Sequence, residues 1–151
     1  MEERKPLEGE ETHIVQIGVV VKDVEKTIEF LTGLGLGPFK VMVNDHPTAV
    51  VRGKKTFWQT KIALSQQGPV QLELIEFQKG TSIQKEYLDE KGEGIHHILF
   101  KVRDINATLE KFAKKGIHII QEDFPDGVRR GGYLDTAEVG VGGIVFEVFQ
   151  K

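Results

Sequence analysis

Four side chains able to bind a metal ion occupy corresponding positions in two similar stretches of the sequence. The first stretch carries Gln16 and Glu73, and the second carries His97 and Glu147. Two carboxylates, an imidazole and an amide oxygen suit a six-coordinate divalent cation, with two positions left for water or substrate oxygens. Such an ion acts as a Lewis acid and stabilises the enolate formed when a proton leaves the carbon beside a carbonyl.

These positions correspond because the chain contains an internal duplication. Residues 16–23 (QIGVVVKD) reappear in altered form at 97–104 (HILFKVRD), 81 positions later and without a gap. A second pair, GPVQLEL at 68–74 and GGIVFEV at 142–148, corresponds at an offset of 74 and aligns Glu73 with Glu147. Self-similarity of this kind indicates repeated supersecondary units. Each unit therefore supplies one polar residue at the start of its first strand and one carboxylate inside its last.

Each unit is predicted to follow the order β-α-β-β-β. Asp23 and Asp104 offer helix N-caps, and each precedes apolar residues at helical spacing. Turn signals at Asn44–Pro47 and Gly53–Lys55 separate strands in the first unit. Runs of β-branched and aromatic residues predict strands at 14–21, 39–43, 48–52, 56–65, 70–77, 96–102, 117–121, 132–136 and 143–149.

The chain is expected to form one α+β domain behind a short tail. Residues 1–12 have no apolar run, which predicts a disordered tail and not a secretory signal. The domain at 13–151 divides into module one (13–79), a linker helix segment (80–94) and module two (95–151). Thr81 and Gln84 fit a capping box for the linker helix. Each module is small for a core of its own, so a shared core is expected.

Composition excludes several classes of function. A formal net charge of −3, with 28% charged and 39% hydrophobic residues, is ordinary for a globular protein. The sequence has no arginine-rich run, so a nucleic-acid partner is not expected, and no apolar stretch approaches the ~20 residues of a membrane span. The absence of cysteine excludes disulfides and thiolate metal sites, and it fits a cytoplasmic protein.

Alternation along the strands predicts which side chains share a face. Gln71, Glu73 and Ile75 lie on one face of strand 70–77, and Glu147 shares a face with Phe149 in the last strand. The opposite, more aliphatic faces are expected to pack against the helices. Both glutamates then face the side where a cavity could lie, and each needs a partner because burying an unpaired charge is costly.

The ordered motifs resemble the vicinal oxygen chelate superfamily, which includes glyoxalase I and methylmalonyl-CoA epimerase. The resemblance covers nearly the whole chain after Thr12 and is closest to the epimerase branch at LELIEF (72–77), KGEGIHHILFKV (91–102) and GGIVFEV (142–148). It implies a glyoxalase-like, half-open β-barrel, with ferredoxin-like and cystatin-like folds as alternatives. It also implies one divalent metal ion (Zn, Ni, Co, Mn or Mg) bound by Gln16, Glu73, His97 and Glu147.

The resemblance further implies an isomerase or epimerase that acts through an enolate on a small carbonyl or acyl-thioester substrate. The epimerase pattern carries a second catalytic Glu where this chain has Phe57 or Trp58, so Glu147, together with Glu73, would serve both faces of the enolate. Some glyoxalase I enzymes have Gln at the position of Gln16, which makes a lactoylglutathione lyase, or a lyase for another thiol adduct, the alternative. A third hypothesis is a metal-free small-molecule binding or resistance protein of the same fold.

Two further groups of residues are candidates for the substrate site. Arg129 and Arg130 lie in the glycine-rich loop DGVRRGG and could bind a substrate carboxylate or phosphate, or belong to a solvated loop. Either Trp58 or Phe57 could line the pocket, since alternation allows only one of them to face it.

The remaining histidines are expected to lie outside the site. His96 points to the face opposite His97 and is predicted to be structural. His13, His46 and His118 have no partners by spacing and are predicted to be ordinary. A homodimer is expected, because C2 pairing is the commonest oligomeric arrangement and the superfamily often forms dimers.

Overall fold

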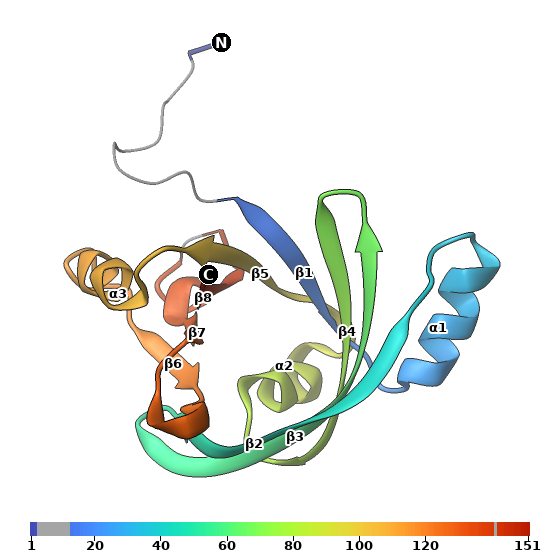
Figure 1. The fold of residues 1–151 in the computed structure, drawn as a ribbon, viewed down its shortest axis with the longest axis horizontal. Coiled ribbons are helices and arrows are strands. Elements are labelled where there is room, and N and C mark those ends of the chain that lie inside the picture. Colours follow the sequence, from blue (N-terminus) through green and yellow to red (C-terminus); the bar gives the residue numbers. More distant parts are fainter. Residues whose placement is uncertain (3–12, 141) are drawn as a thin grey trace.

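The computed structural model describes residues 1–2, 13–140 and 142–151, so the tail predicted at 1–12 falls almost wholly outside the described residues. Helices α1 and α3 lie on the outside of a curved sheet, whereas α2 lies between its walls (Figure 1). The elements are β1 (Ile14–Val20), α1 (Val24–Gly33), β2 (Lys40–Val51), β3 (Lys54–Gln67), β4 (Val70–Gly80), α2 (Ile83–Lys91), β5 (Gly94–Val102), α3 (Ile105–Ala113), β6 (Ile119–Glu122), η1 (Pro125–Gly127), β7 (Gly131–Leu134), η2 (Asp135–Ala137) and β8 (Val145–Gln150). None of these helices has the length and apolar character needed to cross a membrane.

The strands form a closed barrel in the order β1-β4-β3-β2-β6-β7-β8-β5. The modules join through the antiparallel pair β1–β5 and through β2–β6, where only Val50 and Val51 pair with Glu122 and Gln121. Over the rest of β2, the described residues form no pairing with β6. The predicted α+β fold, with two βαβββ modules forming a barrel, is confirmed, and the strand order is closed only by the short β2–β6 pairing.

The duplication extends to the strand register. In module one, parallel β1 and β4 pair Gly18 with Glu73, and in module two, parallel β5 and β8 pair Leu99 with Glu147. These partners are related by the same offsets of 81 and 74 that relate the two sequences. Equivalent positions in the two modules therefore face the same side of the barrel.

Both outer helices begin in the same way. The carboxylates of Asp23 and Asp104 each accept the backbone N–H three residues later at 3.0 Å, as predicted for N-caps. Side chains of the last strands also reach the helices, because Glu76 and Gln150 accept the N–H of the first helical residues at 2.8 and 2.9 Å. Strand β4 is thus hydrogen-bonded to the start of α1, and strand β8 to the start of α3.

The aliphatic faces of the last strands pack under the outer helices, as alternation predicts. Leu74 lies in a buried cluster with Val24 of α1, and Val148 lies in a second cluster with Ile105 of α3. A third cluster, inside the barrel, joins α2 to β2 and β3 through Ala49, Val51, Trp58 and Ile83. The opposite faces of β4 and β8, which carry Glu73 and Glu147, are left to line the interior.

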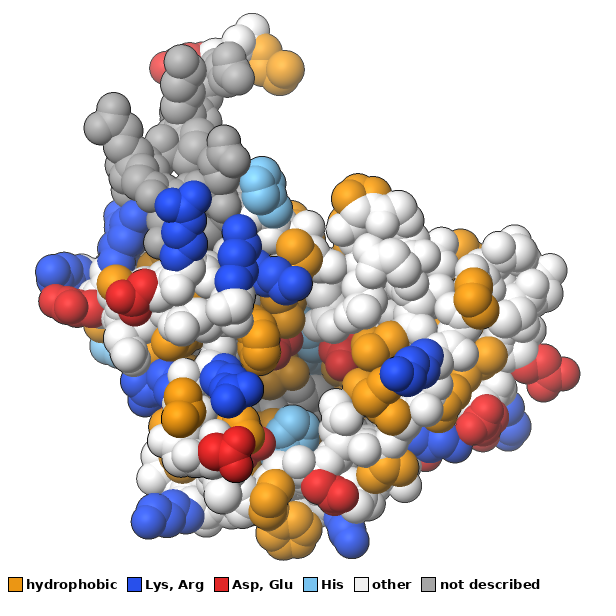
Figure 2. All heavy atoms as spheres, viewed as in Figure 1, with side chains coloured by type: hydrophobic (Ala, Val, Ile, Leu, Met, Phe, Trp, Pro, Cys, Tyr) orange, Lys and Arg blue, Asp and Glu red, His pale blue; other side chains and the backbone are white. Residues whose placement is uncertain are grey.

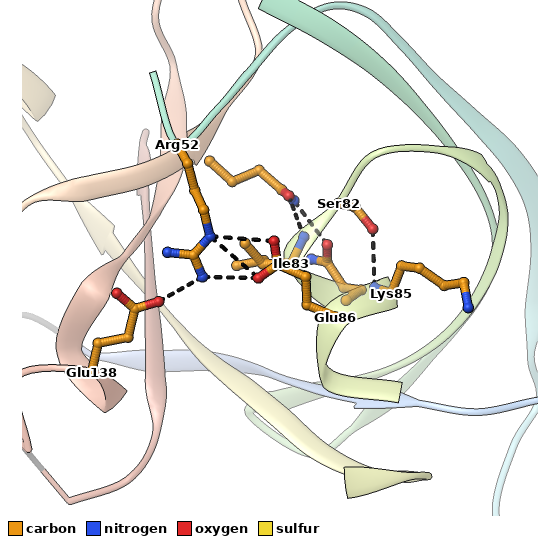
Figure 3. A network of polar contacts seen from close by, with 8 residues as sticks. Arg52, Ser82, Ile83, Lys85, Glu86 and Glu138 are labelled. Carbon is orange, nitrogen blue, oxygen red and sulfur yellow. Dashed lines mark hydrogen bonds and ion pairs between the residues drawn. The ribbon is translucent and has the colours of Figure 1, made fainter. Parts of the chain in front are cut away.

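Helix α2 is held by both modules. Its N-cap is Ser82, whose hydroxyl accepts the Lys85 N–H at 3.1 Å, so the predicted Thr81 capping box is wrong by one residue (Figure 3). Gln84 instead points inward and accepts a hydrogen bond from Gln121. Arg52, from the β2–β3 turn, pairs with Glu86 of α2 at 2.8 Å and with Glu138 of module two at 2.6 Å (Figure 3). These contacts position α2 across the barrel.

The turn predicted at Asn44–Pro47 is wrong, because β2 runs unbroken from Lys40 to Val51. The pairing of β2 with β3 shifts its register between His46 and Ala49. Pro47 has no N–H to donate to the ladder, so the strand accommodates it at an irregularity instead of ending there.

Candidate metal centre

A cavity of about 510 Å³ opens inside the barrel. Figure 2 shows the molecule hollowed near its centre, with acidic and histidine side chains inside the hollow. Of the four predicted metal ligands, Gln16, Glu73 and Glu147 line this cavity, and the wholly buried His97 lies directly behind them. The strand faces predicted from alternation therefore place the two glutamates inside the barrel.

The four residues come from neighbouring strands. Gln16 is on β1, Glu73 on β4, His97 on β5 and Glu147 on β8, and β4-β1-β5-β8 are consecutive in the barrel. Consecutive strands lie about 4.8 Å apart, so side chains from four of them can reach a common point. One continuous wall of the barrel thus supplies all four side chains.

The imidazole of His97 is the centre of this group. Its Nε2 lies 3.1 Å from Glu147 Oε2 and 3.5 Å from both Glu73 Oε2 and Gln16 Oε1. The amide nitrogen of Gln16 donates to Gln71 Oε1 at 2.7 Å, which turns the amide oxygen towards His97. The structure brings all four predicted residues together.

The buried charges of this group act on one another. Burial by itself would lower the pKa of His97, but hydrogen bonds and charge from Glu147 and Glu73 outweigh burial and raise its pKa to about 9. Burial raises the pKa of Glu147, and the Glu73 carboxylate adds to this, while His97 opposes it. Two carboxylates therefore share a single buried cation, the protonated imidazole.

His96 contacts Nδ1, the other ring nitrogen of His97. The two Nδ1 atoms lie 3.1 Å apart, so one must donate its N–H to the other. Burial, with the positive charges of His97 and Lys91, lowers the pKa of His96 to about 3. His96 is therefore the neutral acceptor and His97 the donor. This contact directs His97 Nε2 at the carboxylates, as partners of metal-bound histidines commonly do.

The donor set fits a divalent ion in place of the proton on His97. Ligands about 2.1 Å from an octahedral ion lie about 3 Å from their neighbours, close to the distances from His97 Nε2. The described His, Asp and Glu side chains alone form no group of three arranged to hold a metal. An ion at this point would take the Gln16 amide oxygen as a further donor, and the carboxylates would turn from the imidazole N–H towards it.

The predicted substrate residues lie in different places. Trp58 is 5% exposed and lines the cavity, whereas Phe57 is 49% exposed and points outwards. Arg130 lines an adjoining cavity of about 250 Å³ that shares Trp58 and Glu147 with the first. Arg129 lines neither of these cavities, because its guanidinium pairs with Glu122 at 2.6 and 3.2 Å.

Three residues in or beside the cavity went unrecognised in the sequence. His46, predicted to be ordinary, lines the cavity and contacts Asp123, so that prediction is wrong. Asp123 is 77 residues away, and no spacing signals the pair. Tyr133 lies edge-on to His97 with ring centroids 5.1 Å apart. Burial raises the pKa of Tyr133 well above its ordinary value, and the charges of Glu147 and Glu73 raise it further.

Comparison with known proteins gives the family. Residues 15–134 match the model of the glyoxalase/bleomycin resistance protein/dioxygenase superfamily. No curated protein matches the sequence. Among solved structures, a hypothetical protein from Bacillus halodurans C-125 shares 24% identity at a TM-score of 0.69, covering 94% of this chain and 96% of that one.

Two similar structures are epimerases. A methylmalonyl-CoA epimerase in complex with methylmalonyl-CoA and ammonium shares 23% identity at a TM-score of 0.65, covering 93% of this chain and 94% of that one. The methylmalonyl-CoA epimerase of Mycobacterium tuberculosis shares 19% identity at a TM-score of 0.64, covering 91% and 86%. Because these sequence identities are low, the similarity to the solved structures shows a shared fold alone. The chain belongs to the glyoxalase/bleomycin resistance protein/dioxygenase, or vicinal oxygen chelate, superfamily.

Proposed function

We propose that the protein is a divalent-metal-dependent isomerase or epimerase that acts through an enolate on a small carbonyl or acyl-thioester substrate. The observation that carries the proposal is the meeting of Gln16, Glu73 and Glu147 around His97 Nε2 in one cavity. These four residues would hold one ion of Zn, Ni, Co, Mn or Mg. When bound, the ion supplies Lewis-acid stabilisation of the enolate oxygen.

The chain's own residues perform the proton transfer. Glu147 and Glu73 line the cavity and are only 14% and 12% exposed, so both carboxylates are near a bound substrate and poorly hydrated. In the proposed reaction, Glu147 removes the proton beside the carbonyl. A positioned carboxylate with a raised pKa suits this role, because general bases work best when their pKa approaches the working pH.

The walls of the cavity favour an acyl substrate with an anionic group. Trp58, Ile62 and Leu99 provide apolar surface for the carbon skeleton. Lys101 lines the cavity and Arg130 lines the adjoining one, and neither has an ion-pair partner among the described residues. Such cations bind carboxylate or phosphate groups. Methylmalonyl-CoA, bound in one similar structure, has both and is a suitable first probe.

Deuterium exchange tests the proposal. The protein is stripped with EDTA, reloaded with one metal at a time and incubated with methylmalonyl-CoA in D2O, with deuterium at C2 followed by NMR. We expect exchange with at least one metal and a loss of about 100-fold or more without metal or in Glu147→Gln. Glu138→Gln, which alters a glutamate of the Arg52 network outside the cavity, should retain the wild-type rate.

A glyoxalase I-like lyase is the second candidate, favoured by the Gln16 amide oxygen at the metal-binding group. Hemithioacetals of methylglyoxal with glutathione and other thiols are incubated with the reloaded protein. Thioester formation with no exchange of methylmalonyl-CoA would establish the lyase in place of the epimerase. Failure of both substrate classes with every metal would overturn the proposed function.

A further inference from the structure

A histidine–aspartate pair lies across the barrel from the predicted metal ligands, with His46 lining both the main cavity and the adjoining one and Asp123 lining the adjoining one. His46 Nδ1 is 3.1 Å from Asp123 Oδ2, and its side chain is 26% exposed. The other carboxylate oxygen of Asp123 accepts hydrogen bonds from the Thr48 hydroxyl at 2.5 Å and the Phe124 N–H at 2.9 Å. Asp123 is thereby fixed as the acceptor of the His46 Nδ1–H. His46 Nε2 is left with no partner among the described residues.

The ring of His46 is also held in place from the side. It stacks on Trp58 with centroids 4.2 Å apart and planes at 23°. Thr48 lies within the register shift that follows His46 in β2 and also donates to Asp123, so two neighbouring side chains of β2 contact the same carboxylate. An imidazole with a carboxylate on one nitrogen and the other nitrogen free is arranged to accept and deliver a proton.

The position of His46 relative to Glu147 is the second observation. His46 is on β2, which lies four strands from β5 in the closed order of eight, directly across the barrel from His97. The predicted ligands occupy the wall β4-β1-β5-β8. His46 and Glu147 nevertheless line both the main cavity and the adjoining one. Both side chains therefore border the space that a substrate would occupy.

We propose that His46, oriented by Asp123, is the second proton carrier of the proposed reaction and acts on the enolate face opposite Glu147. This inference rests on the proposed function, because inversion at carbon requires proton removal from one face and delivery to the other. His46 is the catalytic residue of the pair, and Asp123 is a positioning residue.

Every proton and electron pair in the proposed reaction is accounted for by the residues named. The Glu147 carboxylate takes the proton from carbon, and the electrons of the broken C–H bond form the enolate. The His46 imidazolium then delivers its Nε2 proton to the other face, and the enolate electron pair forms the new C–H bond. The N–H electrons stay on the imidazole, and nothing is oxidised or reduced. Exchange with water, or turnover of the opposite epimer, restores both groups.

The test separates proton exchange from inversion. Each epimer of methylmalonyl-CoA is incubated in D2O with metal-loaded wild type, His46→Gln or His46→Phe. The glutamine variant can still donate a hydrogen bond to Asp123, and the phenylalanine variant can still stack on Trp58. Each variant thus keeps one contact of the wild-type side chain, and a result from either one that folds is enough for the test. We expect epimerisation to fall about 100-fold or more, while the epimer deprotonated by Glu147 still gains deuterium with retained configuration. His118→Gln, which changes an exposed histidine outside the cavity, should behave as wild type.

Asp123→Asn tests the positioning role. We expect epimerisation to fall about 10-fold or more, with an unchanged rate of deuterium gain at the Glu147 face and partial rescue by Asp123→Glu. A merely structural change would lower exchange and epimerisation of both epimers in equal proportion.

Failure of the His46 inference can be distinguished from failure of the proposed function. Wild-type epimerisation in a folded His46 variant, or equal loss of all exchange in both His46 variants, would overturn the inference and leave the proposed function standing. Wild-type protein that exchanges no proton of methylmalonyl-CoA with any metal would overturn the epimerase proposal, and the inference with it.

Discussion

Gly18 on β1 leaves the space that the His97 ring occupies on the paired strand β5. The antiparallel register sets Gly18 opposite His97. A Cβ at position 18 would lie 2.0 Å from Cε1 and 2.4 Å from Nε2 of His97, much closer than van der Waals contact. Because His97 is wholly buried, its ring cannot move aside without displacing its neighbours. The position of the imidazole thus depends on the absence of a side chain on the adjacent strand.

Gly18→Ala is therefore expected to disable the proposed metal centre. The added methyl should displace His97 from the carboxylates, lower metal content below about a tenth of an equivalent, and cost about 1–3 kcal/mol of stability through overpacking. Elemental analysis after reloading and urea unfolding measure these effects. Gly33→Ala, at the end of α1 with no atom within 4 Å of the added Cβ, is the matched control. Full metal binding by Gly18→Ala would show that the ring position is not required.

The raised pKa of His97 predicts a pH dependence of stability in the metal-free protein. Its pKa rises from 6.5 to about 9 on folding, so the folded state retains a proton that the unfolded state releases. The stabilisation is complete below about pH 6.5 and is lost as pH rises through about 9. Urea unfolding in EDTA should show a larger advantage of wild type over His97→Gln near pH 6 than near pH 9.5. An advantage equal at both pH values would contradict the charge pairing.

His96 is expected to strengthen metal binding through His97. His96→Phe retains a ring beside Tyr87 and Tyr133 but removes the acceptor for His97 Nδ1–H. The affinity for metal should fall about 10- to 100-fold, as measured by competition with a chelating dye. His118→Phe provides the control. Unchanged affinity in His96→Phe would mean that neighbouring packing alone orients the His97 ring.

The buried amide of Gln121 is expected to contribute to global stability. Its oxygen accepts the Ile83 N–H and its nitrogen donates to Gln84 Oε1, both at 2.8 Å. Gln121→Leu leaves those partners buried without hydrogen bonds, at a cost of about 1–3 kcal/mol for each group. Gln78→Leu, which removes an exposed amide, should change stability by less than about 0.5 kcal/mol. Equal unfolding free energies for the two variants would refute this role of Gln121.

Much of the fold, and the meeting of the four predicted ligands, follows from the sequence because the duplication carries over to the strand register. The offsets that align Glu73 with Glu147 also relate the paired strands, so alternation alone places both glutamates inside the barrel. The predicted N-caps at Asp23 and Asp104 are confirmed for a different reason, because each depends only on residues close to it in the sequence. The homodimer and the cytoplasmic location stay predictions.

The remainder depends on contacts that local patterns do not encode. Pro47 is typical of a turn, but β2 continues through it at a register shift, and His46 beside it contacts Asp123. Arg129 and Arg130 are equivalent in the sequence, yet Glu122 pairs with Arg129 while Arg130 lines a cavity. The first outcome depends on a contact between residues 77 positions apart, and the second on how the loop after β6 folds back onto Glu122.

The most direct test is an anomalous-scattering map of crystals of the metal-loaded protein. We predict one peak in the barrel cavity, about 2.0–2.3 Å from the Gln16 amide oxygen, the His97 Nε2 and the carboxylates of Glu73 and Glu147. A peak bound elsewhere, or a cavity without a peak in protein loaded with each of the candidate metals, would contradict the account.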